Sequence, residues 1–513
     1  MPDENGFYQL NPIKYTTRAL LKRSNDKSIV FRHGHIAITG YRMGDNKEFE
    51  KALSVFDEVR WKYELKGGYY IPELHEFRIN RGFNPEVLAK YFKGYEVKVE
   101  NDAYPSDKVD IQLLTPPKDD LQRVGLTFMC SQGEYKRNAR YTQQLIDADT
   151  GSGKTFLGAA SSCFLSARTL IVIPFTVLAD QWKNTYLSFT SLTEDEILVV
   201  QGSDMCKKIM NGKYKNVKVF IMLSDTISSF CKRYGNLETI EFLRSMNVYV
   251  KIVDEIHKDM KAISMIEALS NFHMNYYMSA TPGRADRKEN WIFKMGFWNV
   301  PHFGSKFKVQ EEKHINVMVK TYRFLPTSAQ IKKMVNQRKG WLNPKAYETV
   351  LLTAPQEQSE DFLNSLKAML KWAKGLLKDG NKILILSETI DGTGCMQGIA
   401  EEVFPGKTSR YYGTMKPADK KAGLQGTVIC ATTTSLGTGA DIPGIQFVFN
   451  ITTYANKIAA SQLPGRARPL KDGTPVWYCE LVNMSYMKTV RQYEKRKPDL
   501  IKKSKTGKIM VVT

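Results

Sequence analysis

The chain has 513 residues, 42% of them hydrophobic, and its 74 Lys and Arg against 53 Asp and Glu give a formal net charge of +21. This length exceeds a single core and predicts roughly three or four domains. No apolar run approaches the roughly 18 to 20 residues that span a bilayer, and the acidic, polar start does not read as a secretory signal. We therefore expect a folded protein without a membrane partner, whose natural partner is a polyanion.

The cysteines are odd in number, scattered and never in C-x-x-C spacing, which favours a reducing compartment and argues against a structural zinc site. We expect a cytoplasmic monomer. The seven positions are 130, 163, 206, 231, 395, 430 and 479.

Residues 1–105 are predicted to form a small α+β module. Alternation over 28–41 indicates strands, a polar helix is expected over 46–58, and Lys66-Gly67-Gly68 is typical of a hairpin turn. Basic and aromatic residues alternate here, which suits a nucleic-acid backbone with stacking nearby, although any small β-core also needs aromatic strands. They are Arg60, Trp61, Lys62, Tyr63, Lys66, Tyr69, Tyr70, Arg78 and Arg81.

Residues 100–121 are rich in Pro and Asp and are interpreted as a linker. Gln132 follows, 22 residues before Lys154. Its amide could pair with the edge of an adenine, and Phe128 or Tyr135 could cover the ring; a surface glutamine is the alternative.

A glycine-rich turn then follows the strand-like run TQQLID and ends in Gly153-Lys154-Thr155. Glycines let successive N–H groups point at a polyphosphate, and the positive end of the following helix adds to this. Lys154 would reach the β- and γ-phosphates, and the Thr155 hydroxyl would help to hold Mg²⁺. The usual G-x-x-x-x-G-K-[ST] pattern has Ala148 at its first position. The predicted ATP-binding loop comprises Asp149, Thr150, Gly151, Ser152, Gly153, Lys154 and Thr155.

Beyond the turn, strand and helix patterns alternate as in a parallel α/β sheet. Strands are expected in 169–182, 197–204, 217–227 and 248–260. The last of these ends in Asp254-Glu255, at the sheet edge where such folds bind ligands. Asp254 can hold Mg²⁺ through its water shell, and Glu255 can orient or deprotonate the attacking water.

In order, ADTGSGKT, DEIH and SAT resemble motifs I to III of superfamily 2 helicases and translocases of the DExH type. KILILSET (382–389), TTSLGTGADIPG (433–444) and SQLPGRARP (461–469) are similar to motifs IV to VI. The resemblance implies two tandem RecA-like lobes, 106–305 and 306–485, with ATP in the cleft between them and a basic tail at 486–513.

The resemblance also implies roles for single residues. His257, Ser279 and Thr281 would link hydrolysis to lobe movement. In the second lobe, Gly439 and Asp441 would lie near the ribose and phosphates, while Gln462 and Arg466 would reach the γ-phosphate.

The family pattern Q-x-x-G-R-x-x-R is broken here, because Pro469 takes its last position and the second arginine comes one residue early, at Arg468. Arg466 is the expected arginine finger, and the role of Arg468 stays open.

Hydroxyls at strand ends are expected to contact phosphate and sugar, with weak sequence preference. The candidates are Thr176, Ser203, Thr226, Ser387, Thr414 and Thr438. Residues 330–347 are interpreted as a solvated connecting helix or an arm on the second lobe. The basic tail is interpreted as a DNA contact or as a disordered end.

The motif wording and the small leading module are similar to phage branch-migration and fork-remodelling helicases of the UvsW type. The resemblance implies an ATP- and Mg²⁺-dependent DNA helicase that remodels branched DNA. The alternatives are an RNA helicase, a nuclease-coupled motor, and a nucleic-acid clamp that binds ATP without turnover. A clamp would need neither Glu255 nor Arg466.

Overall fold

The computed structural model describes residues 27–57, 60–148, 152–280, 286–304, 313–336, 340–436, 442–453, 463–470 and 472–512. The chain divides into two compact units, Met1–Val309 and Gln310–Thr513. Among the described helices, none is both long and apolar enough to cross a membrane.

The first unit is built on a seven-stranded parallel sheet, as the alternating strand and helix pattern predicts. Its strands are rich in Val, Ile and Leu and are buried on both faces, as parallel strands covered by helices must be. In spatial order they are β10 (Ile197–Val200), β11 (Val219–Leu223), β9 (Thr169–Ile173), β12 (Val250–Val253), β13 (Met274–Ser279), β8 (Gln143–Asp147) and β14 (His302–Phe303).

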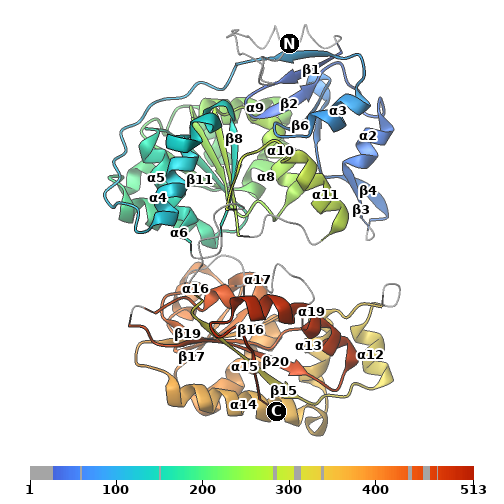
Figure 1. Cartoon of the computed structure of the whole chain (residues 1–513), viewed down its shortest axis with the longest axis vertical. Coiled ribbons are helices and arrows are strands. Elements are labelled where there is room, and N and C mark those ends of the chain that lie inside the picture. The colour runs from blue at the N-terminus through green and yellow to red at the C-terminus, as the bar shows by residue number, and fades with distance from the viewer. Residues whose placement is uncertain are drawn as a thin grey trace. The chain divides into compact units, whose positions relative to one another are not determined.

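Helices cover both faces of this sheet (Figure 1). One face packs on α4 (Asp120–Met129), α5 (Lys154–Phe164) and α6 (Val177–Phe189), with Trp182 fully buried in that core. The other face packs on α7 (Ser203–Met210), α8 (Ser224–Tyr234), α9 (Asn236–Ser245), α10 (Met260–Leu269) and α11 (Arg287–Gly296).

The N-terminal module is a small α+β domain, as predicted. Its five-stranded sheet is β5 (Tyr69–Ile71), β6 (Glu76–Asn80), β2 (His35–Ile38), β1 (Ser28–Phe31) and β7 (Glu96–Val99), with α2 (Lys47–Ala52) and α3 (Pro85–Tyr91). Its apolar residues continue without a break into the core formed by α7 to α11. The module is therefore an integral part of the first unit.

Buried polar contacts also join the module to the lobe. Arg78 donates to the Ala268 carbonyl at 2.7 Å, and Gly34 N–H donates to Asn271 Oδ1 at 2.8 Å. The segment 100–121, interpreted as a linker, lies on the lobe as well, because Tyr104 Oη donates to the Leu269 carbonyl at 2.8 Å and Ile111 is buried. The first half of this segment is thus packed against the first unit.

The predicted hairpin turn at Lys66-Gly67-Gly68 is wrong. The hairpin pairs β3 (Ser54–Asp57) with β4 (Lys62–Leu65), so four residues of the helix expected over 46–58 are strand. Gly67 is required by a close approach, since a Cβ there would lie 2.5 Å from Ile292 Cγ2. Packing against a distant helix, rather than turn geometry, explains this glycine.

The second unit is also built on a seven-stranded parallel sheet, which confirms the prediction of two tandem RecA-like lobes. Its spatial order is β17 (Thr408–Tyr411), β18 (Val428–Thr432), β16 (Lys382–Ser387), β19 (Ile445–Asn450), β20 (Val476–Asn483), β15 (Ile315–Tyr322) and β21 (Met510–Val512). Its helices are α12 (Ser328–Met334), α13 (Pro344–Thr353), α14 (Gln356–Leu376), α15 (Ile390–Val403), α16 (Pro417–Gly423), α17 (Thr433–Leu436) and α19 (Met487–Lys503).

Two segments of the second unit differ from their predictions. Residues 330–347 form no single solvated helix, because α12 and α13 bury Met334 and Tyr347 in the core of the unit. Residues 486–513 are no separate tail: α19 buries Leu500, and β21 pairs with β15 at the edge of the sheet. Basic residues dominate this stretch of sequence, so the few apolar residues that pack against the unit were not recognised as a helix face.

Candidate nucleotide site and nucleic-acid contacts

The phosphate loop leaves the carboxyl end of β8 and enters α5 at Lys154. Gly153 precedes the helix with φ of +86°, a left-handed conformation that glycine adopts readily. Asp149, Thr150 and Gly151 lie outside the described residues. The Ser152 hydroxyl is buried and has no hydrogen-bond partner among the described residues, as expected for a polar group that awaits a ligand.

Lys154 and Thr155 begin α5, where the helix N-terminus favours an anion. Lys154 Nζ donates to the Ala148 carbonyl at 2.6 Å, so the ammonium group folds back over the loop. Thr155 Oγ1 accepts a hydrogen bond from Gln181 Nε2 on α6 at 3.1 Å. The hydroxyl predicted to bind metal is therefore already oriented by the neighbouring helix.

Asp254 follows the buried strand β12, which lies between β9 and β13 in the sheet. Its Oδ2 accepts from the Trp182 indole N–H at 2.9 Å, and its Oδ1 accepts from the Glu255 backbone N–H at 2.9 Å. Burial, with the negative charge of Glu255, raises the pKa of Asp254 to about 6, while the ammonium group of Lys154 opposes the shift. Asp254 is therefore mostly ionised at neutral pH.

Glu255 is held in an unusual conformation, with φ of +49°. A non-glycine residue in this backbone region costs on the order of 1 to 3 kcal/mol, which the surrounding contacts must offset. Burial alone would raise the pKa of Glu255, but the hydrogen bond and charge of His257, with the charge of Lys154, hold the pKa below its ordinary value. Glu255 is thus a carboxylate at neutral pH.

His257 links Glu255 to the next strand. Its Nδ1 lies 3.0 Å from Glu255 Oε2 and 2.9 Å from Ser279 Oγ, at the end of β13. The structure thus brings together Glu255, His257 and Ser279 from the predicted set, whereas Thr281 lies outside the described residues. This histidine therefore contacts both the carboxylate that follows β12 and the hydroxyl at the end of β13.

Gln122 was missed by the sequence reasoning and lies against the phosphate loop. It is buried on α4, its Oε1 accepts from Lys118 N–H at 2.9 Å, and its Nε2 would lie 2.3 Å from a Cβ at Gly153. Gln132 is exposed at the start of a short 3₁₀ helix, Gly133–Arg140, and its side chain makes no capping hydrogen bond. In the sequence, only the N-cap residue Asp119 indicated that a helix carrying Gln122 begins here.

The hydroxyls predicted to contact nucleic acid fall into two groups. Thr176 and Thr414 are exposed, and Ser203 is half-buried at the start of α7. Thr226 is largely buried within α8, and Ser387 is fully buried with its Oγ donating to Glu348 Oε1 at 2.7 Å. The prediction is wrong for Ser387, whose hydroxyl serves the fold of the second unit; Thr438 lies outside the described residues.

Of the remaining residues predicted in the second unit, Arg466 and Arg468 are described. Arg466 ends a 3₁₀ turn, Pro464–Arg466, and is 9% exposed, whereas Arg468 is half-buried. Gly439, Asp441 and Gln462 lie outside the described residues.

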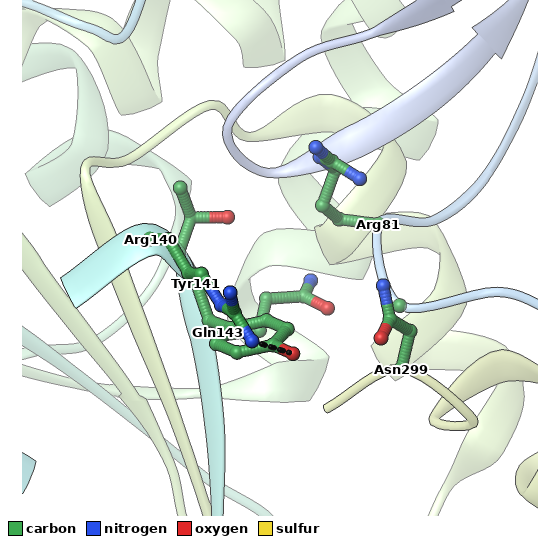
Figure 2. Close-up of a pocket in the computed structure, with 7 residues that line it drawn as sticks. Arg81, Arg140, Tyr141, Gln143 and Asn299 are labelled. Carbon is green, nitrogen blue, oxygen red and sulfur yellow. Dashed lines mark hydrogen bonds between the residues drawn. The ribbon is translucent and has the colours of Figure 1, made fainter. Parts of the chain in front are cut away.

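A separate pocket lies between the module and the first lobe and is lined by Arg81, Arg140, Tyr141, Gln143 and Asn299, with Gly82 and Thr142 (Figure 2). In it, an Arg140 guanidinium N–H donates to Tyr141 Oη at 3.5 Å. Its volume is about 50 Å³, far below the roughly 300 to 1,000 Å³ of small-molecule sites. It is therefore too small for a nucleotide.

Comparisons with known proteins match mainly the first lobe. A family model described as the res subunit of type III restriction enzymes matches residues 121–284, which contain Lys154, Thr155, Asp254 and Glu255. A protein named DNA 3'-5' helicase XPB, from Kineococcus radiotolerans, is 30% identical over 149 residues, 28% of this chain and 24% of that protein. The match thus spans about a quarter of that relative's length.

Two further likenesses extend over both lobes. Transcript termination protein A18 of Yaba-like disease virus is 23% identical over 412 residues, covering 76% of this chain and 78% of that protein. The structure of Dbp5 from S. cerevisiae, bound to RNA and ADP BeF3, superimposes with a TM-score of 0.49 at 13% identity, covering 77% of this chain and 93% of that one.

Proposed function

We propose that this protein is an ATP-dependent DNA helicase or translocase that remodels branched DNA. The observation that carries the proposal is the pair Asp254 and Glu255 at the carboxyl end of β12, with Asp254 buried beside Trp182, Glu255 half-buried beside His257, and the charge of Lys154 acting on both. A protein named as a DNA helicase is similar to this chain in the first lobe. The sequences of the helicase motifs resemble those of branch-migrating members of superfamily 2.

The residues fit a nucleotide triphosphate with Mg²⁺. Thr155 and Asp254 would hold the metal, and the unpartnered Ser152 hydroxyl offers a donor to a phosphate oxygen. Bound Mg²⁺ would neutralise charge that develops on the transferred phosphoryl group. Lys154 would leave the Ala148 carbonyl and bind the β- and γ-phosphates.

Glu255 would orient the attacking water, since a carboxylate with a lowered pKa accepts a hydrogen bond at neutral pH. His257 keeps Glu255 in place and connects it to Ser279. Gln122, rather than Gln132, would read the adenine, because it is the glutamine that lies against Gly153. Arg466 is the arginine proposed to stabilise the transition state. An arginine in this role can increase the rate of hydrolysis by about 10³ to 10⁵.

Contacts to phosphate by Thr176, Ser203 and Thr414, together with a formal net charge of +21, would give sequence-tolerant binding that weakens steeply with salt. A clamp that binds ATP without turnover would not need a strained, ionised Glu255.

The test is the rate of ATP turnover with single-stranded DNA, duplex, forked DNA, four-way DNA and RNA measured in parallel. Lys154→Ala serves as the blank. Branched or duplex DNA is expected to stimulate most. If RNA stimulates most, the protein is an RNA helicase, and if no polymer stimulates, the motor proposal fails.

A further inference from the structure

The β3–β4 hairpin carries three exposed aromatic side chains. Trp61 is 70% exposed, Tyr63 is 57% exposed and Phe56 is 37% exposed. The hairpin forms a two-stranded sheet of its own, outside the five-stranded sheet of the module. Exposed aromatic rings grouped on one small element indicate an interaction site rather than a core.

Ring contacts gather these three side chains into one cluster. Phe56 pairs directly with Tyr63, and their ring centroids lie 5.2 Å apart. Trp61 directly precedes β4 with a left-handed backbone (φ of +52°), and its ring centroid lies 5.2 Å from that of Phe56, so the three rings form one cluster. Lys51 Nζ lies 5.9 Å from the Tyr63 ring centroid, which adds a cation beside the aromatic face.

Ion pairs and packing hold the base of the hairpin to the first lobe. Glu64 Oε1 accepts from Lys261 on α10 at 2.7 Å, and Glu64 Oε2 lies 2.9 Å from Lys66 Nζ. Hydrogen bonds from Lys261 and Lys66 lower the pKa of Glu64 to about 2. The Lys66 carbonyl also accepts from Ser264 Oγ at 2.6 Å. The aromatic face is therefore presented from a fixed base.

The two helices at this base follow the catalytic segments directly. α10 begins at Met260, three residues after His257, and α11 begins at Arg287, eight residues after Ser279. Lys66 also lies 3.9 Å from Glu289 on α11. Small shifts of the strand ends during ATP turnover would thus reach the hairpin through its base.

The charges around the hairpin favour nucleic acid over an apolar partner. Its two described acidic side chains are engaged with cations, Asp57 with Arg60 and Glu64 with Lys66 and Lys261. Lys62 is exposed and forms no ion pair among the residues that the structure describes. An aromatic face beside exposed cations suits a nucleotide, because a base can stack on the rings while its phosphate binds the cations.

We propose that this hairpin is a base-stacking element, in which Trp61, supported by Phe56 and Tyr63, stacks on the first unpaired base where duplex DNA opens. The inference rests on the proposed function, since it assigns the DNA branch point a place on this protein. Stacking on an aromatic face is sequence-tolerant, as a translocating enzyme requires.

The experiment uses the full chain, because the module shares its core with the first lobe and its deletion would expose that core. Forked DNA carries 5-iodouracil at the first unpaired position, and irradiation joins it to a stacked aromatic ring. The wild-type protein is expected to give a crosslink that maps to Trp61. Trp61→Ala is expected to reduce its yield and the affinity for the fork by about tenfold, as the loss of one stacked base predicts.

Two variants control for unspecific effects. Trp61→Phe retains a ring and should restore most of the crosslink. Trp298→Ala removes a tryptophan that is 60% exposed elsewhere in the first unit and should behave as wild type. An unchanged crosslink in Trp61→Ala, or a crosslink that maps to another surface, would overturn the inference.

The failure of the inference and that of the proposed function are distinguishable. If DNA stimulates ATP turnover while Trp61→Ala binds and separates forks like wild type, the motor stands and the stacking role is wrong. If DNA does not stimulate wild-type turnover, the proposed function fails first.

Discussion

Trp182 donates its indole N–H to Asp254 Oδ2 at 2.9 Å, so a fully buried side chain on α6 orients the carboxylate proposed to hold Mg²⁺. The preceding residue, Gln181, donates to Thr155 Oγ1, the other proposed metal ligand. The same helix begins beside Thr176, an exposed candidate for phosphate contact. This one helix thus connects the proposed phosphate contact to both residues that are proposed to hold Mg²⁺.

Trp182→Phe should keep the ring but lose this hydrogen bond. Partners of metal ligands commonly contribute 10- to 100-fold in metal affinity, so the Mg²⁺ concentration needed for half-maximal ATP turnover should rise about tenfold. The measurement is a Mg²⁺ titration of turnover at saturating ATP.

Tyr186→Phe is the matched control, since it removes a buried hydroxyl on the same helix that bonds Ser162 at 2.8 Å. It should lower stability without changing the Mg²⁺ dependence. An identical Mg²⁺ titration for both variants would refute the positioning role of Trp182.

Gln122→Ala should raise the KM for ATP and weaken the preference for ATP over GTP. A hydrogen bond of this kind contributes about 1 to 1.5 kcal/mol, so we expect about a tenfold change in the ratio of kcat/KM for the two nucleotides. Gln132→Ala, at an exposed position, should leave the ratio unchanged. If Gln132→Ala changes the ratio and Gln122→Ala does not, the adenine contact belongs to Gln132.

Lys251 and Glu267 form a buried ion pair at 2.6 Å, and Glu267 also accepts from Tyr277 Oη at 2.6 Å. Glu267→Leu would leave the Lys251 ammonium without its counter-charge in the core. Breaking such a pair costs about 3 to 5 kcal/mol, which should appear as a lower urea midpoint.

The double variant Lys251→Met/Glu267→Leu should recover much of that loss, because it removes both charges and their desolvation cost. A double variant less stable than Glu267→Leu alone would contradict this expectation. It would show that the Lys251 ammonium stabilises the fold even without Glu267.

Acidification should destabilise the first unit through His33. Burial, with the nearby His273 and Arg81, lowers the pKa of His33 to about 4, below the ordinary value of about 6.5. Between these values the unfolded chain binds a proton that the folded chain excludes. The stability is therefore complete above about pH 6.5 and is lost as the pH falls toward 4.

His33 is expected to contribute on the order of 1 to 2 kcal/mol to the loss of stability between pH 7.5 and pH 5, and His33→Gln should remove that contribution. Urea unfolding at both pH values measures it. Equal pH dependence in the variant and the wild type would assign the effect to other groups, such as His35. Burial and the charges of Arg78 and Arg32 lower the pKa of His35.

Strands such as β9 and β12 were predictable because they are rich in Val and Ile. The position of Asp254 and Glu255 after β12 was predictable because the Val- and Ile-rich run ends there, and their catalytic roles stay predictions. Local pattern and chemistry agree at these positions.

The errors share a different cause. Gly67 was mistaken for a turn because the side chain it approaches, Ile292, lies far along the chain. Gln122 was overlooked because its contact with Gly153 exists only in three dimensions. The basic surface of 486–513 concealed Leu500, although the spacing of its apolar residues was available in the sequence. Contacts between distant segments cannot be read from a single sequence.

The most direct measurement follows ATP-dependent conversion of a labelled four-way DNA junction into its product duplexes. The wild-type protein is predicted to convert the junction with ATP and Mg²⁺, and Lys154→Ala is predicted to bind it without conversion. Wild-type protein that hydrolyses ATP on the junction but leaves it intact, or conversion that proceeds equally in Lys154→Ala, would contradict the account.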